Sequence, residues 1–189
     1  KNVLNRAGTS GKPSQPFNQI LDGQFVNYAA SGRYPLLNEF GELLIITHDA
    51  FAANVQPLAD WKNATGIPTT MVNVSAIGND AASIQAYIQN FYDTHNLAFV
   101  LLVGDAAEVA TLKSSGSAAD PRYALVAGTD SYPDIFVGRF SAETADEVDT
   151  QVQRTIAYEQ SNRQEAWFRR GTGIASNQGP GHYGEYDDE

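Results

Sequence analysis

The sequence contains no cysteine among its 189 residues. Disulfide bonds, thiolate metal sites and a cysteine nucleophile are therefore excluded within this chain. No apolar run approaches the roughly 18–20 residues that a membrane-spanning helix needs. The first residues, Lys1–Arg6, contain no apolar core of a signal peptide. The lack of disulfides does not by itself assign the protein to the cytosol.

Positive charge is also scarce. Twelve lysines and arginines stand against 22 aspartates and glutamates, which gives a formal net charge of −10. This balance argues against nucleic acid or an anionic membrane as a partner, and it is compatible with cationic ligands or with an ordinary solvated surface. With 42% hydrophobic and 11% aromatic residues, the chain can build a core for one domain, or one domain plus an appendage.

From residue 36 onward, short apolar segments alternate with segments of helical periodicity. Such alternation predicts an α/β fold with a parallel sheet and right-handed crossovers. The predicted strands are 42–47, 69–74, 99–103, 122–127, 134–140 and 171–176, and the predicted helices are 49–64, 80–96 and 144–161. Asp80 is expected to cap the second helix, and Thr144 with Glu147 forms a capping box for the third.

The central strand is expected at Phe99–Val103, because a continuous apolar run suits burial on both faces. Gly104 and Asp105 follow it, at the edge where open α/β sheets place their chemistry. The segment Ala127–Asp134 adds the carboxylates of Asp130 and Asp134, and we expect these to meet Asp105 in a cation-binding rim beside a cleft. The alternative is that Asp105 caps a helix and the other two aspartates are turn residues.

The first 33 residues differ in character from the rest. A Gly/Ser/Pro-rich run from Ala7 to Pro16 is typical of a linker. Ser31–Pro35 forms an exposed joint, in which Arg33 is a candidate cleavage point for a basic-specific protease. The alternative is that Arg33 is only a surface residue in front of a strand.

Five short strings together resemble the gingipain family (peptidase family C25) of caspase-like cysteine endopeptidases. They follow the family's order at compatible spacing: Asp60–Asn63, Val100–Asp105, Phe136–Ser141, Arg154–Glu159 and Ile174–Ser176. The resemblance implies a parallel caspase-like sheet with helices on both faces. It also implies that residues 1–33 are the tail of a pro-segment, removed between Arg33 and Tyr34. Residues 34–189 would then be the first part of the catalytic domain.

The resemblance further implies a calcium site. By position, its ligands are the carboxylates of Asp105, Asp130 and Asp134 and the backbone carbonyls of Ala127 and Tyr132. Calcium takes six to eight oxygen ligands and accepts such a mixture of carboxylates and carbonyls.

The terminal segment carries three further implied positions. Asp187 matches the aspartate at the base of the pocket for an arginine side chain, and Glu185 matches a ligand of a second calcium site. Gln178 is a departure, because it stands where the family has a glutamate near the catalytic histidine. Glutamine can orient an imidazole but cannot stabilise imidazolium by charge. The alternative for Glu185 and Asp187 is a solvated acidic tail.

The function implied is that of a secreted or cell-surface cysteine endopeptidase zymogen that cleaves peptides after arginine. The family's catalytic cysteine and histidine come later in the chain, and His182 does not match that histidine. The expected partner is therefore the remainder of the catalytic domain, and residues 1–189 alone would be inactive. Two alternatives are a sorting transpeptidase of the same family and a non-catalytic, calcium-dependent scaffold or binding domain.

Overall fold

The computed structural model describes residues 41–161 and 166–172. The chain divides into two compact units, residues 1–156 and 157–189, and each is described by itself. Within the described residues no helix is both long and apolar enough to cross a membrane.

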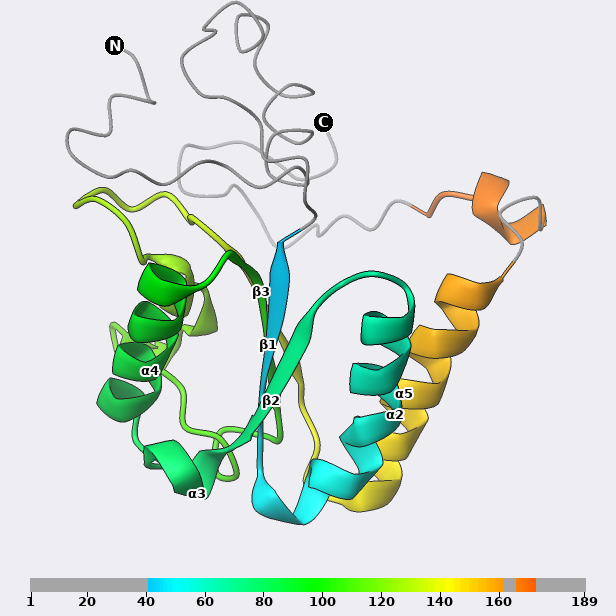
Figure 1. Ribbon diagram of the computed structural model, residues 1–189, viewed down its shortest axis with the longest axis horizontal. Coiled ribbons are helices and arrows are strands. Elements are labelled where there is room, and N and C mark those ends of the chain that lie inside the picture. Colours follow the sequence, from blue (N-terminus) through cyan, green and yellow to red (C-terminus); the bar gives the residue numbers. More distant parts are fainter. Residues whose placement is uncertain (1–40, 162–165, 173–189) are drawn as a thin grey trace, which may run out of the picture. The chain divides into compact units, whose positions relative to one another are not determined.

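The first unit is built on a four-stranded parallel sheet (Figure 1). Its order is β2–β1–β3–β6, and the strands are β1 (Glu42–Thr47), β2 (Thr69–Asn73), β3 (Leu97–Val103) and β6 (Phe136–Phe140). Five of the six residues of β1 and five of the seven residues of β3 are buried. This burial fits central strands covered on both faces. The predicted α/β fold with a parallel sheet is confirmed.

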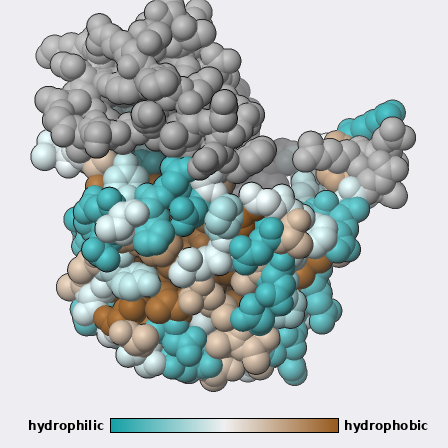
Figure 2. All heavy atoms as spheres, viewed as in Figure 1, coloured by the Kyte–Doolittle hydropathy of each residue, from teal (hydrophilic) through white to brown (hydrophobic). Residues whose placement is uncertain are grey.

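Helices cover both faces of this sheet (Figure 1). One face packs against α4 (Ala81–Thr94), and the other packs against α2 (Ala52–Ala64) and the start of α5 (Ala145–Gln160). The two sets of buried residues alternate along β1, so that Leu44 and Ile46 face α4 while Leu43 and Ile45 face α2. On the surface shown in Figure 2, hydrophilic side chains predominate and apolar ones lie between them.

The local signals for two helix starts are confirmed. Asp80 accepts hydrogen bonds from the amides of Ala82 and Ser83 at the start of α4. In the capping box of α5, the Glu147 carboxylate accepts from the amides of Glu143 and Thr144, and the Thr144 hydroxyl accepts from the Glu147 amide. Each pairing satisfies amides that a helix leaves without an internal partner.

Short elements complete the unit. They are the 3₁₀ turn η2 (Asp49–Phe51), the helix α3 (Val74–Ile77), the hairpin β4 (Lys113–Ser114) and β5 (Ser117–Ala118), and the 3₁₀ helix η3 (Asp120–Ala124). The strand predicted at 122–127 is wrong, because the chain there forms η3, with a proline in its first turn. Tyr123 is buried against the α4 face, and its hydroxyl donates to the Ala110 carbonyl at 3.0 Å.

The second unit, as far as it is described, contains the end of α5 and the 3₁₀ helix η4 (Ala166–Arg169). Its aromatic side chains contact one another: the rings of Trp167 and Phe168 stack at 3.9 Å, and Tyr158 lies 5.5 Å and 5.7 Å from them. Gly171 and Thr172 are not in a strand, and the rest of the strand predicted at 171–176 lies outside the described residues.

Candidate functional site at the carboxyl edge of the sheet

The four parallel strands all have their carboxyl ends at one end of the sheet, which we call the carboxyl edge. The end at which the strands begin is called the amino edge. In Figure 1 the carboxyl edge is the lower end, where η2 follows β1. Backbone hydrogen bonds continue past the strands there. The amides of His48, Gly104 and Asp105 donate to the carbonyls of Val103, Phe140 and Ala142 at 3.0, 3.0 and 2.9 Å. The backbone that carries Asp105 is therefore fixed by its neighbours.

Asp105 presents a carboxylate at this edge. Its Oδ1 accepts a hydrogen bond from the Ser141 hydroxyl at 2.9 Å, and the side chain is half-buried. The Ser141 hydroxyl, with the Ala106 amide and the positive charge of Arg139, holds the pKa of the Asp105 carboxyl below its ordinary value despite partial burial. The carboxylate is ionised at neutral pH and can attract a cation.

Arg139 fixes the turn that follows β3. Its Nε and Nη2 donate to Asp120 at 2.7 and 2.9 Å, and its Nη1 donates to the carbonyls of Gly104, Asp105 and Val109 at 2.7, 3.2 and 2.8 Å. Burial alone would raise the pKa of the Asp120 carboxyl, but hydrogen bonds from Arg139 and Thr111 outweigh it and lower the pKa. Sequence reasoning missed Arg139. The available signal was a charged residue inside an apolar strand, which needs a partner when it is buried.

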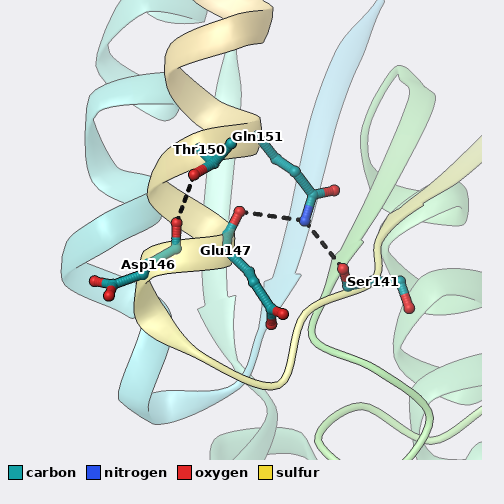
Figure 3. A pocket seen from close by; sticks show the side chains of 5 residues that line it. All are labelled: Ser141, Asp146, Glu147, Thr150 and Gln151. Carbon is teal, nitrogen blue, oxygen red and sulfur yellow. Dashed lines mark hydrogen bonds between the residues drawn. The ribbon is translucent and has the colours of Figure 1, made fainter.

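A hollow beside Ser141 opens at the start of α5 (Figure 3). Its lining is polar: Ser141, Asp146, Glu147, Thr150 and Gln151. Gln151 Nε2 donates to the Ser141 carbonyl at 3.0 Å, and the Thr150 hydroxyl donates to the Asp146 carbonyl at 2.8 Å. The hollow therefore shares Ser141 with Asp105, and the Gln151–Ser141 hydrogen bond joins α5 to the residue that follows β6.

The segment 126–134 lies at the amino edge, and the predicted meeting of Asp105 with Asp130 and Asp134 is wrong. In the β3–β6 register Phe99 pairs with Phe136. Asp134 precedes Phe136 by two residues, whereas Asp105 lies six residues beyond Phe99. At roughly 3.3 Å per residue, the two aspartates are separated by about 25 Å along the strands. Accordingly, the described residues contain no group of three His, Cys, Asp or Glu side chains that could hold a metal ion.

Within that segment, Asp134 organises the backbone. Its Oδ2 accepts from the amides of Val126 and Ala127 at 3.0 and 2.7 Å, and its own amide donates to the Ala124 carbonyl at 2.8 Å. Asp130 is exposed, and its Oδ1 accepts from the amide of Tyr132 at 3.0 Å. Asp130 thus forms an Asx turn, as the alternative reading of a turn residue expected.

The remaining predicted site residues lie outside the described residues. These are the processing pair Arg33 and Tyr34, the departure Gln178, and the implied binding residues Glu185 and Asp187.

Comparison with known proteins identifies the family. The model of Peptidase family C25 matches residues 37–189. The chain belongs to peptidase family C25. It is 31% identical over 186 residues to gingipain R1 of Porphyromonas gingivalis, covering 95% of this chain and 18% of that protein. It is also 31% identical over 169 residues to gingipain R2 of the same species, covering 86% of this chain and 23% of that protein.

Two solved structures agree with this assignment to the C25 family. The crystal structure of the Arg specific cysteine proteinase gingipain R superposes with a TM-score of 0.71 at 30% identity, covering 78% of this chain and 36% of that one. The complex of the pro- and mature domains of Porphyromonas gingivalis RgpB gives the same values. The C25 chain described here therefore spans only a minor part of the length of its relatives.

Proposed function

We propose that the whole protein is a cysteine endopeptidase that cleaves after arginine, and that residues 34–189 supply the first part of its catalytic domain. The observation that carries the proposal is the likeness to a structure described as an Arg specific cysteine proteinase, 30% identical over 78% of the chain. A cysteine outside this segment would attack the scissile carbonyl as a thiolate, with a histidine as acid and base. We also propose export of the whole protein to the cell surface or medium.

The specificity would rest on Asp187. A carboxylate facing a guanidinium gives a charge-assisted, bidentate contact, so its loss should affect arginine substrates selectively. The test is the hydrolysis, by full-length protein, of matched peptides with Arg, Lys or an uncharged residue before the cleaved bond. Asp187→Ala should lower kcat/KM for the Arg peptide far more than for the uncharged one, and Asp60→Ala, which changes an exposed acid on α2, serves as the control. Equal wild-type activity on all three peptides would contradict the proposal.

We propose further that residues 1–33 are the end of a pro-segment that is cleaved between Arg33 and Tyr34. The family model begins at residue 37, whereas gingipain R1 aligns with 95% of the chain, more than residues 37–189 alone provide. Likeness to a relative thus continues upstream of the family domain. Intact mass of the mature protein should place its first residue at Tyr34, and Arg33→Gln should retain the longer form. A mature protein that keeps Lys1 would contradict this proposal.

We propose that the protein binds calcium through the segment 127–134. The carboxylates of Asp130 and Asp134 and the carbonyls of Ala127 and Tyr132 would supply oxygen ligands of the kind that calcium prefers. Four donors are fewer than the ion requires, so further ligands must come from water or from other residues. Asp105 lies at the opposite edge and would have to serve a different ion. The resemblance assigns Glu185 to a second calcium site.

Asp130→Asn tests the calcium proposal cleanly. Asparagine keeps the side-chain oxygen that accepts from the Tyr132 amide, but it removes the negative charge. Wild-type protein should melt at a higher temperature in millimolar calcium than in chelator. Asp130→Asn should reduce this difference, and Asp60→Asn, which changes an exposed acid on α2, should preserve it. An unchanged melting temperature of the wild type on chelation would refute a stabilising ion.

A further inference from the structure

Arg139 occupies a position where a charge is costly. It lies in β6, and its side chain is only 12% exposed. Along this strand, Val137 packs with the α4 core, and Arg139 points to the same face because strand side chains alternate. Burial of a guanidinium is unfavourable unless its donors are paired. In the structure, all three nitrogen groups of the Arg139 guanidinium are paired by hydrogen bonds at the carboxyl edge.

The pairing has two parts that can be separated by mutation. Asp120 takes two donors in a bidentate contact and is itself held by the Thr111 hydroxyl at 2.6 Å. The third donor group, Nη1, contacts only backbone carbonyls, those of Gly104, Asp105 and Val109. Asp120 therefore orients the guanidinium, and the guanidinium in turn gathers three carbonyl oxygens of one turn.

That turn is short, and its other supports are hydrogen bonds of the backbone and of two neighbouring side chains, Asn79 and Ser141. Within it, the amides of Glu108 and Val109 donate to the Asp105 carbonyl at 3.1 and 2.9 Å. From the opposite side, Asn79 donates to the Glu108 carbonyl and accepts from the Ala110 amide. Backbone hydrogen bonds from the amides of Gly104 and Asp105 hold the start of the turn to Phe140 and Ala142. Arg139 adds the side-chain contact that ties the carbonyls of Asp105 and Val109 to β6, the strand that leads directly to Ser141. This side-chain contact acts together with the Asp105 amide–Ala142 carbonyl bond in placing the Asp105 carboxylate beside Ser141.

We propose that Arg139 is a positioning residue of the carboxyl edge, which sets the place of the Gly104–Val109 turn and of the Asp105 carboxylate through its three carbonyl contacts. The inference rests on the proposed peptidase function, in which this edge borders the cleft. Lysine cannot replace it, because a single ammonium cannot form the bidentate contact and reach the carbonyls at the same time.

The experiment compares three variants of the full-length protein. Arg139→Lys removes most of the carbonyl contacts, whereas Asp120→Asn weakens the ion pair and leaves the guanidinium beside the carbonyls. Arg122→Lys is the matched control, since the exposed Arg122 donates to one carbonyl, that of Lys113, away from the turn. For each variant we would measure kcat and KM on the Arg peptide, the melting temperature, and amide hydrogen exchange in peptides covering 104–112.

We expect Arg139→Lys to lower kcat/KM by about 100-fold, the effect of a displacement near 1 Å in a catalytic site. Exchange in 104–112 should accelerate while exchange in β1 stays slow. Asp120→Asn should lose less than tenfold, and Arg122→Lys should match the wild type. A loss below tenfold in Arg139→Lys would overturn the proposal. So would losses of activity that simply follow the fall in melting temperature across the three variants, because stability alone would then explain them.

Two safeguards keep the test decisive. If Arg139→Lys fails to fold, the double variant Arg139→Gln with Asp120→Asn replaces it, since it leaves neither charge buried alone. If the wild-type protein cleaves no peptide, the peptidase proposal fails. The positioning role of Arg139 can then still be tested by comparing the hydrogen-exchange rates of wild type and Arg139→Lys in residues 104–112. Unchanged exchange in 104–112 would then reject it.

Discussion

Replacement of Gly104 by alanine should destabilise the first unit strongly. Alanine substitutions at two other glycines, Gly116 and Gly138, separate the two causes, which are backbone strain and a steric clash. Gly104 ends the central strand with φ +127°, a conformation that residues with a side chain rarely adopt. A Cβ placed there would also lie 2.7 Å from the Cβ of Glu108. Gly116 of the β4–β5 hairpin has φ +86° but nothing within 4 Å, and Gly138 of β6 has neither a positive φ nor a close neighbour.

The magnitudes follow from these differences. Backbone strain at a positive φ costs about 1–3 kcal/mol, and overpacking in a filled site costs about 1–3 kcal/mol more. Gly104→Ala should therefore lose about 4 kcal/mol of unfolding free energy, Gly116→Ala about 1 kcal/mol, and Gly138→Ala nearly nothing. For a chain of this size, about 4 kcal/mol corresponds to a fall in Tm on the order of 10 °C.

Urea unfolding followed by circular dichroism measures the three losses on one scale. The slope of the unfolding free energy against urea must stay constant for the midpoints to be compared as stabilities. The reasoning is refuted if Gly104→Ala lies within about 1 kcal/mol of Gly116→Ala, because the contact with Glu108 would then cost nothing. It is also refuted if Gly138→Ala is as destabilising as the other two.

Other residues give narrower tests. Ile88 of α4 is fully buried against the sheet. Ile88→Ala should therefore lower the unfolding free energy in the same urea assay by about 2–5 kcal/mol. Gln85 of the same helix is exposed, and Gln85→Ala should stay within about 0.5 kcal/mol of wild type. Hydrogen bonds from the Ser83 hydroxyl and amide lower the pKa of the Asp80 carboxyl in the folded chain. The ionised carboxyl therefore stabilises the fold at pH values above its unfolded pKa, near 3.9. This contribution is lost as the pH falls through the lower pKa of the folded chain. The difference in urea midpoint between wild type and Asp80→Asn should accordingly shrink between pH 6 and pH 3, roughly across the unfolded pKa; a constant difference would rule out Asp80 as the titrating cap. In the capping box of α5, Glu147→Gln should slightly lower the melting temperature, and Glu143→Gln, whose side chain is exposed outside the box, should leave it unchanged.

The elements predicted well from the sequence are those in which pattern and environment agree. The apolar run Leu43–Ile46 of β1 fits a strand buried on both faces, and the spacing of Ile84, Ile88 and Phe91 matches one face of α4. Asp80 and the Thr144–Glu147 pair are local signals whose hydrogen bonds depend on few residues. Such features require no knowledge of the rest of the fold.

The segment 122–127 shows where the pattern misleads. Its apolar residues are buried, as expected, but burial comes from packing beside α4 rather than from pairing in the sheet. Pro121 favours the first turn of a helix. Burial raises the pKa of Tyr123 to about 12 and keeps its hydroxyl neutral as a donor to the Ala110 carbonyl. That donor site exists only because the chain after β3 folds back along the sheet, which no local signal reports.

The direction of the strands decides which acidic residues can share a site. The sequence places Asp105 directly after one strand and Asp134 directly before another, and both positions look like loop residues next to a sheet. An additional strand at 122–127 would have carried the chain to the carboxyl edge before residue 134, and Asp134 could then have met Asp105 there. Because β3 and β6 are parallel and adjacent, the end of one and the start of the other lie at opposite edges. Asp105 can therefore cooperate only with groups that reach the carboxyl edge, such as Ser141, while an ion bound by the segment 127–134 would stabilise the entrance to β6.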